Sequence, residues 1–223
     1  MTRLTQFLDG QSKLAIAAVL IPVYWLAYTV PNQLGADHAR LLPLTALDRA
    51  IPFVPESIWI YLTVYFFLVA AFLMSRDGLP NSQAVYAFVA MTAVGATIHL
   101  LFPTAIDRGA FPIGPEVDVA SRTAFGYLRS VDTAASCLPS LHVANATLAA
   151  LLHVHTNRRR AVAMSVWAVA ISLSTLLTKQ HYALDVVAGA VLAFAAYLVF
   201  CEQPVLRSTA SVLATFRTQT RRR

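Results

Sequence analysis

Six apolar runs constrain the fold of this chain more than any other feature. Crossing about 30 Å of hydrocarbon takes roughly 20 apolar residues in a helix. Only helices and closed barrels satisfy all their backbone hydrogen bonds in lipid. The runs therefore predict an all-α integral membrane protein with about six transmembrane helices in a single domain, residues 1–223. The runs cover residues 14–30, 58–74, 84–102, 138–155, 161–178 and 182–201.

The composition excludes an ordinary soluble domain. Hydrophobic residues make up 57% of the chain and charged residues 13%, and the mean hydropathy is +0.61. The net charge is +6, and the cations flank the apolar runs, which fits lipid headgroups rather than nucleic acid. We therefore expect membrane lipids and no nucleic acid as partners. The basic tail, residues 205–223, fits either an amphipathic helix on the membrane surface or an unstructured segment.

Lys and Arg residues are distributed unevenly between the two sets of loops. Short cytoplasmic loops carry the excess of these residues. One set has six, at positions 40, 49, 108, 122, 129 and 179. The set with both termini has eleven, at positions 3, 13, 76, 158, 159, 160, 207, 217, 221, 222 and 223. We therefore expect a multi-pass cell-membrane protein with cytoplasmic termini, and with His142 and His181 on the outer side.

The segment between the fifth and sixth runs carries ionisable residues. His181 and Asp185 are four positions apart, so a helix from residue 182 onward would place them on one face. The carboxylate can then fix one imidazole nitrogen and leave the other free. Lys179 adds a cation beside the pair. Ionisable groups at a membrane edge indicate a functional site, although a buried pair that only satisfies itself has the same spacing.

A second polar patch, Pro139-Ser140-Leu141-His142, opens the fourth run. Proline suits a first helical turn, whose free N–H groups attract anions. The Ser140 hydroxyl and His142 add polar groups there. Taken alone, this patch is more simply explained as an ordinary helix start with an interfacial histidine. Together the two patches offer an anion site, a cation, an oriented nucleophile or base and an acid, which is the equipment of phosphoryl transfer.

The two patches resemble the motifs of the type 2 phosphatidic acid phosphatase superfamily. Pro139-Ser140-x-His142 is followed about forty residues later by His181-x-x-x-Asp185. Members of this family are membrane lipid phosphatases and phosphotransferases whose helical core is shared with vanadium haloperoxidases. Leu141 replaces the family's Gly, and Ser174-Thr175 replaces its Ser-Arg. Both departures resemble the inositol phosphorylceramide synthase-like branch, as does, more weakly, the segment 51–55.

The resemblance implies a role for each motif residue. His181 would attack phosphorus and become a phosphohistidine, and Asp185 would orient it. His142 would protonate the departing oxygen, and Ser140 would bind a phosphate oxygen. Lys179 would supply the charge of the arginine that the third motif lacks here. The resemblance implies a lipid phosphate as the substrate and water or an alcohol as the acceptor. We expect no cofactor or metal, because no pair of carboxylates lies near the histidines in the sequence and Lys179, Arg108 and helix N–H groups can meet the phosphoryl charge.

The family's first motif is a Lys followed, after six residues, by Arg-Pro. This chain has no clean match to it. Arg108 follows the third run at a suitable place, but Gly109 stands where the proline should be. Arg122 and Arg129 are separated by six residues, yet no proline follows them. We expect Arg108 to bind phosphate, with Arg122 and Arg129 as alternatives.

Two functions of other classes also fit these residues. One is a metal-dependent membrane hydrolase with His99, His142, His181 and Asp185 as ligands, since these side chains suit zinc or iron. For His99 a satisfied helix histidine is the simpler interpretation. The other is a lipid transporter or binding protein in which the histidines only hold an anionic headgroup. Sensitivity to a chelator distinguishes the first, and absence of phosphate or headgroup release distinguishes the second.

Overall fold

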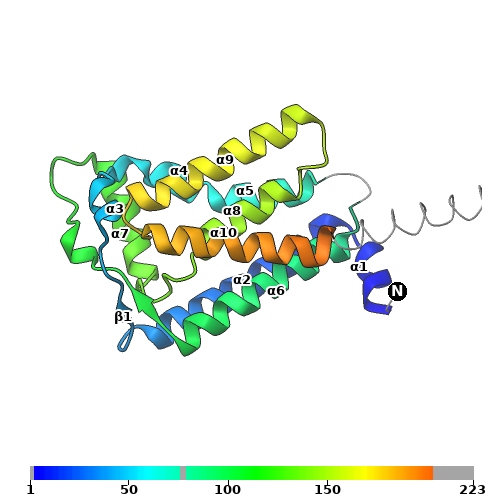
Figure 1. Cartoon of the computed structure of the whole chain (residues 1–223), viewed down its shortest axis with the longest axis horizontal. Coiled ribbons are helices and arrows are strands. Elements are labelled where there is room, and N and C mark those ends of the chain that lie inside the picture. The colour runs from blue at the N-terminus through cyan, green and yellow to red at the C-terminus, as the bar shows by residue number, and fades with distance from the viewer. Residues whose placement is uncertain (1–2, 76–78, 203–223) are drawn as a thin grey trace, which may run out of the picture.

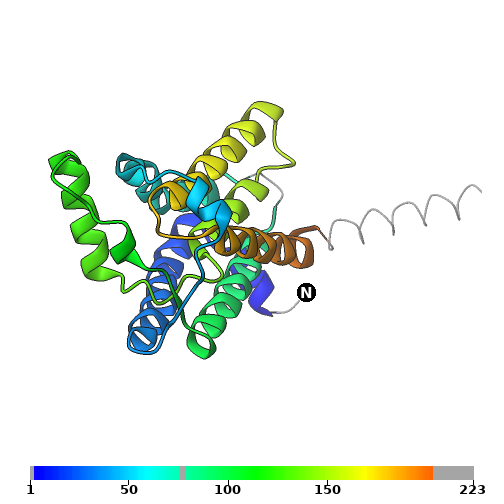
Figure 2. The same cartoon turned by 60° about the vertical axis from the view of Figure 1, so that its left-hand side comes forward.

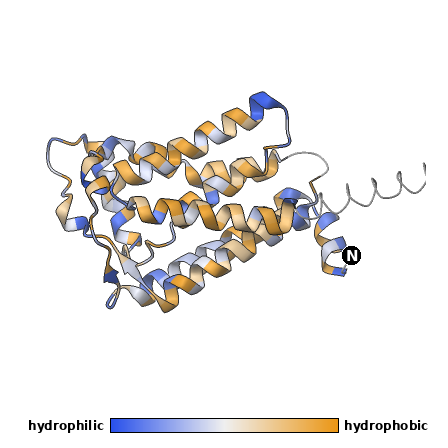
Figure 3. Cartoon of the chain, in the orientation of Figure 1, coloured by the Kyte–Doolittle hydropathy of each residue, from blue (hydrophilic) through white to orange (hydrophobic). Residues whose placement is uncertain are grey.

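The computed structural model describes residues 3–75 and 79–202. Its long helices run side by side as a bundle, with loops and short elements gathered at one end (Figure 1). Arg76 and the tail predicted over residues 205–223, with its cations, lie outside the described residues. In Figure 3 the middle parts of the long helices are largely apolar, while polar residues gather toward the two ends.

Five segments of the described chain are long and apolar enough to span a membrane. They confirm an all-α membrane fold and match five of the six predicted runs to within one residue at the ends that the runs overhang. They are α2 (Lys13–Gly35), the broken pair α4 (Ile58–Leu62) and α5 (Val64–Leu73) with the preceding turn η1 (Pro55–Ser57), α6 (Asn81–Leu101), α9 (Arg158–Leu177), and α10 (Ala183–Tyr197) continued by η3 (Leu198–Glu202). A short helix, α1 (Arg3–Asp9), precedes them.

The fourth predicted run differs from its expected length. The helix α8 covers only Leu141–Leu151, 11 residues, or about 16 Å at 1.5 Å per residue, so it is too short to cross the hydrocarbon alone. It lies inside the bundle and contacts α5, α9 and α10. Nine of its residues are buried. Because neighbouring helices surround it, α8 does not need the length of a lipid-exposed span.

Side-chain caps set the beginnings of several helices. Ser12 accepts a hydrogen bond from the Ala15 N–H at the start of α2, and Asn157 accepts one from the Arg160 N–H at the start of α9. Such caps satisfy N–H groups that have no partner within the helix. The helix α2 runs past Pro31 to Gly35, so the predicted loop begins later than the proline suggested.

Short elements cover the end of the bundle where the site lies. Strands β1 (Arg40–Leu41) and β2 (Thr104–Ala105) pair in parallel, with Arg40 opposite Thr104. The other short elements are α3 (Ala46–Ala50), η2 (Arg108–Ala110) and α7 (Val119–Val131). The long polar segment 103–137 thus contains an amphipathic helix, α7, whose buried Phe125 and Leu128 pack on Ile58 and Tyr61. Figure 2 shows α7 to one side of the bundle.

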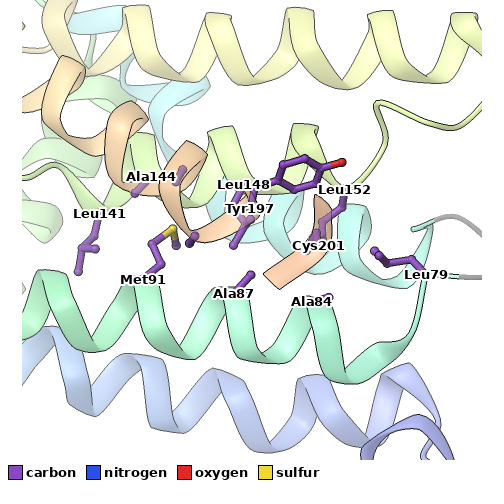
Figure 4. Packing of buried hydrophobic residues seen from close by; sticks show 12 residues of the cluster. Leu79, Ala84, Ala87, Met91, Leu141, Ala144, Leu148, Leu152, Tyr197 and Cys201 are labelled. Atoms are coloured by element: carbon purple, nitrogen blue, oxygen red, sulfur yellow. The ribbon is translucent and has the colours of Figure 1, made fainter. Parts of the chain in front are cut away.

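The largest apolar cluster joins α6, α8 and α10. Figure 4 shows Met91, Leu141 and Leu148 directed into the space between these helices. Buried alanines, among them Ala87 and Ala144, complete the cluster. Small residues let helices approach closely within a membrane. This packing holds the beginning of α8 against the beginning of α10, where both polar patches lie.

Candidate active site

The two polar patches meet where α8 and α10 begin. The Ser140 N–H donates to the Asp185 carbonyl at 3.1 Å, and the Ser140 hydroxyl oxygen accepts from the Val143 N–H at 3.3 Å as the cap of α8. A Cβ atom on Gly189 would lie 2.3 Å from the Ser140 carbonyl oxygen. The contact between the helices therefore requires glycine at this position.

His181 and Asp185 form the predicted pair one turn apart. The His181 Nδ1 atom lies 3.4 Å from an Asp185 carboxylate oxygen, an ion-pair distance rather than a hydrogen bond. The same oxygen accepts from the Tyr182 N–H at 2.9 Å. The Thr175 carbonyl accepts from the His181 N–H at 3.2 Å, which fixes the turn between α9 and α10. The imidazole is thus held with Nδ1 toward the carboxylate.

His142 lies opposite this pair inside a group of tyrosines. Its ring centroid is 6.2 Å from that of His181. The Tyr61 ring stacks on His142 at 4.4 Å, and Tyr65 and Tyr28 present edges to it at 5.9 and 6.4 Å. The His142 Nε2 atom is buried and has no hydrogen-bond partner within the described chain. The aromatic rings fix the imidazole plane and leave a nitrogen available for a ligand.

An apolar cavity of about 170 Å³ extends from His142 along α8. Its walls come from α2, α5, α6 and α8 and include Leu148, Ala149 and Leu152. Asn145, one turn beyond His142, is a polar exception, and its Oδ1 atom is buried without a partner in the described chain. His142 is therefore reached by an apolar passage within the membrane-spanning part of the bundle.

Arg108 lies on the other side of the pair and is tied to Asp132. Its guanidinium donates to the Asp132 carbonyl and carboxylate and to the Gln180 side-chain oxygen, the last at 2.8 Å. Gln180 directly precedes His181. Of the three arginines considered from sequence, Arg108 is the one that these bonds connect to the histidine pair.

Asp132 is the centre of a buried polar network that the motifs did not reveal. Besides Arg108, it accepts hydrogen bonds from the Tyr28 hydroxyl at 2.9 Å and the Asn32 amide at 2.8 Å. Burial acts to raise the pKa of Asp132, but the charge and hydrogen bonds of Arg108, with Tyr28, hold it below its usual value. A charged Asp132 fixes the position of Arg108.

Lys179, predicted from the sequence to meet phosphate charge, is bonded to backbone carbonyls of the described chain. Its ammonium donates to the carbonyls of Asp48 and Ile51 at 2.7 and 2.6 Å, and it lies 5.3 Å from the Phe111 ring centroid. The Asp48 carboxylate accepts from the Ala183 N–H at 2.8 Å. The structure therefore ties Lys179 to α3 and the segment after it, so that α3 holds the turn that carries His181.

The remaining candidates lie around this centre. Arg122 and Arg129 extend from α7 and line a separate cavity that they share with Arg108. His99 is fully buried, and its Nε2 atom is 3.0 Å from the Pro139 carbonyl oxygen, which makes it a support for the start of α8.

Comparison with known proteins identifies the family. The PAP2 superfamily model matches residues 24–199, a range that includes every site residue described above. The chain belongs to the PAP2 superfamily. Searches of curated proteins and of solved structures each gave no match. Membership in the PAP2 superfamily, together with the apolar helices, supports a membrane protein with a phosphatase-type activity.

Three potential metal ligands of this PAP2 superfamily chain lie together, namely Cys137, His181 and Asp185, with ligand atoms within 4.8 Å of one another. The Cys137 thiol, however, donates to the Ala134 carbonyl at 3.1 Å. Burial raises the pKa of this thiol, whereas a metal binds the thiolate. The donor set therefore fits a metal ion poorly.

Proposed function

We propose that this PAP2 superfamily member is a membrane lipid phosphatase or phosphotransferase that acts through a phosphohistidine on His181. The observation that carries the proposal is the placement of His142. It faces the His181–Asp185 pair at 6.2 Å between ring centroids and stands at the end of an apolar cavity. A lipid phosphate fits such a site, because its apolar chain suits the cavity and its phosphorus atom suits the space between the histidines.

The reaction uses the free nitrogen of His181. Its lone pair forms an N–P bond while the P–O bond to the lipid breaks, and the departing oxygen takes a proton from His142. Attack requires about 3–3.5 Å between reacting atoms, and proton transfer about 2.6–3.2 Å. The separation of the two rings suits a phosphoryl group between them. In the second step His142 accepts the proton of water or an alcohol, which attacks phosphorus and releases His181.

Charge on the phosphoryl oxygens is met by groups around the pair. Arg108 is the proposed phosphate-binding cation, because Gln180 links it to the turn of His181. The Ser140 hydroxyl accepts the cap bond from Val143, which leaves its own proton to donate to a phosphate oxygen. Lys179 acts by position, since its ammonium is bonded to two carbonyls. Catalysis of phosphoryl transfer depends mainly on such positioning and charge.

The dimensions of the apolar cavity support a lipid substrate. His142 and Leu152 both line it. They are ten residues apart on the chain, which corresponds to about 15 Å along a helix at 1.5 Å per residue. Half of a hydrocarbon core of about 30 Å has the same depth. The cavity thus suits one hydrocarbon chain of a lipid in the leaflet on the side of His142, which we propose to be the extracytoplasmic leaflet.

Transfer of a phospho-headgroup, as in the inositol phosphorylceramide synthase-like branch, is the proposed reaction when an alcohol is the acceptor. Hydrolysis is the same reaction with water. The Pro-Ser-Leu-His form of the second motif, at residues 139–142, supports the branch. The protein residues that act are the same in both reactions.

Turnover of a long-chain alkyl phosphate by the purified protein tests this proposal. Release of phosphate should persist in EDTA and be inhibited by vanadate, which adopts the trigonal-bipyramidal geometry of the transition state. Loss of activity in EDTA with recovery on adding one metal would instead support the metal-dependent hydrolase, with Cys137, His181 and Asp185 as the nearest ligand set. Binding of the lipid without any release of phosphate or headgroup would support a non-catalytic lipid-binding protein.

A further inference from the structure

A second cavity, which we call the arginine cavity, lies beside the proposed active site. Its volume is about 460 Å³, and Arg108, Arg122 and Arg129 line it together with apolar and glycine residues. Ligand sites commonly have volumes of about 300–1,000 Å³. These arginines are the only charged residues that line it within the described chain. The cavity thus has the size of a ligand site and a single sign of charge.

Two of the three arginines lack an acidic partner. Arg108 is paired with Asp132. Within residues 3–75 and 79–202, neither Arg122 nor Arg129 forms an ion pair. Asp118, one turn before Arg122, does not line the cavity, and its carboxylate accepts from the Ser121 N–H as the cap of α7. The capping bonds of Ser121 lower the pKa of Asp118, and the charge of Arg122 adds to this shift, but the two side chains form no ion pair. No acidic residue of the described chain lines the arginine cavity, so its wall carries positive charge.

Within the part of the chain that the structure describes, Arg129 combines an unpaired charge with an unsatisfied nitrogen atom. One of its terminal nitrogens donates to the Phe111 carbonyl at 3.1 Å, and its guanidinium lies 5.5 Å from the Phe125 ring centroid. Its Nε atom is buried without a partner in the described chain. Burial and the charge of Arg108 lower the pKa of Arg129. Bringing two guanidinium groups together is unfavourable, and an anion between them would offset that repulsion.

The apolar cavity, the two histidines and the arginine cavity are connected one after another. The apolar cavity ends at His142, His181 faces His142, and Gln180 connects the turn of His181 to Arg108, which lines the arginine cavity. A substrate with its chain in the apolar cavity and its phosphorus between the histidines would direct the rest of its headgroup toward Arg108. The histidines and Ser140 do not line the arginine cavity.

We propose that the arginine cavity binds a second anionic group of the substrate's headgroup, beyond the phosphorus that His181 attacks. This inference rests on the proposed function and narrows its substrate class to lipids whose headgroup carries more than one phosphate-like charge. Arg122 and Arg129 bind that group, while Arg108, paired with Asp132, separates it from the phosphoryl group at the histidines.

Binding of two matched ligands tests the inference. Dissociation constants for dodecyl phosphate and dodecyl diphosphate are measured by thermal stabilisation of the full chain in detergent. The wild type should bind the diphosphate at least tenfold more tightly. Arg129→Gln and Arg122→Gln should each remove about tenfold or more of that preference, as expected for a charged hydrogen bond, and leave the affinity for dodecyl phosphate within about threefold. Arg40→Gln is the control, since Arg40 is exposed on β1.

Several outcomes would overturn the inference. One is an unchanged preference in both variants, and another is an absent preference in the wild type. Equal loss of both ligands would assign the arginines to the transferred phosphoryl group. Stability of the wild type is also compared in phosphatidylglycerol and phosphatidylcholine nanodiscs. If the wild type is more stable in phosphatidylglycerol, and the variants lose this difference but keep the diphosphate preference, Arg122 and Arg129 bind bilayer lipid instead. If Arg129→Gln does not fold, the half-buried Arg122 decides.

The binding readout also separates this inference from the proposed function. The binding measurement does not require turnover. Suppose that the protein prefers the diphosphate through Arg122 and Arg129 but turns over no phosphate ester. This result would refute the proposed function alone. A protein that hydrolyses alkyl phosphates but binds both ligands equally would refute the inference alone.

Discussion

At the scale of single residues, the contacts of Lys179 predict that this residue positions the active site and does not bind the phosphate itself. The residue is 3% exposed, and its ammonium is bonded to the carbonyls of Asp48 and Ile51. Burial lowers the pKa of Lys179, and the nearby charge of Asp48 opposes that shift. Since Asp48 also accepts from the Ala183 N–H, the group holds together the two ends of the turn that carries His181.

The structure predicts that Lys179→Ala lowers stability and activity together. The buried Asp48 carbonyl loses its donor, which costs about 1–3 kcal/mol, and the partly exposed Ile51 carbonyl loses its donor at a smaller cost. The turn of His181 also loosens. Thermal unfolding and alkyl phosphate turnover measure the two effects. Lys13→Ala is the matched control, because Lys13 also donates to a carbonyl, that of Ser75 at 2.9 Å, but belongs to α2 at the opposite end. It should lose stability and keep its activity.

The result that would contradict this role is a variant at Lys179 that is as stable as the wild type and yet a hundredfold or more slower. That pattern is expected of a direct phosphate ligand, for which one strong donor contributes roughly 10²–10³ in rate. It would restore the role that the sequence predicts for Lys179.

The sequence reveals the site residues that differ in polarity from their neighbours in the chain. His142, His181 and Asp185 are polar residues at the edges of apolar runs, and their spacing predicts that they meet. Tyr61 comes from an apolar run rich in aromatics, where it resembles any interfacial aromatic. Asp132 contacts Asn32 and Tyr28 about a hundred positions away, and nothing in one sequence indicates such long-range pairing.

At the scale of elements, the approach of α8 and α10 brings the two motifs together. Figure 1 shows these helices side by side, and the Ser140 N–H reaches the Asp185 carbonyl across their beginnings. The sequence predicts both helix starts to within two residues. It places Pro139 in the first turn of α8, but Pro139 precedes the cap of that helix, Ser140, and α10 begins at Ala183, directly after Tyr182. The sequence overestimates α8 because hydropathy continues through residues 152–155, where the chain has already turned.

Gly189→Ala should disrupt this approach. The added Cβ would meet the Ser140 carbonyl oxygen at 2.3 Å, so α10 must move away from α8 and carry Asp185 with it. Overpacking of this kind costs about 1–3 kcal/mol, and we expect at least a tenfold loss of turnover. Unfolding temperature and kcat provide the readouts.

Gly126→Ala is the control for that substitution, with unfolding temperature as its main readout. Because Gly126 lines the arginine cavity, turnover of the two variants is compared with a single-phosphate ester, which does not extend into that cavity. Gly126 is also in a helix, α7, and a Cβ there meets nothing within 4 Å. Alanine should be neutral or stabilise α7 by up to about 1 kcal/mol. Equal behaviour of the two variants would show that the close approach of α8 and α10 does not control the site.

At the scale of the whole molecule, the side of the membrane on which the site lies depends on how the helix bundle is oriented. The short elements α3, α7 and β1 lie at one end of the bundle, and α1 lies at the other (Figure 1). The distribution of Lys and Arg predicts that the end with α7 faces outside. A reporter inserted near Gly114 should therefore be external, and one fused after Arg223 cytoplasmic. Reversed signals would place the active site on the cytoplasmic side.

The proposed mechanism passes through a covalent intermediate at His181. A nucleophile is needed for every substrate, whereas an acid is needed only for a poor leaving group such as a lipid alkoxide. An aryl phosphate with an acidic phenol should therefore still phosphorylate His142→Ala, although that variant no longer turns over lipid phosphate. Asp185→Asn should fall between the wild type and His181→Ala, because the imidazole loses its fixed orientation.

The most direct test is to map acid-labile phosphate on His142→Ala after it reacts with a labelled aryl phosphate. We predict a burst of phenol release with the label on His181, and neither burst nor label in His181→Ala. Label on His142 of the wild type would exchange the roles of the two histidines. Absence of label and burst from both variants, while the wild type turns over the ester, would contradict the phosphohistidine mechanism.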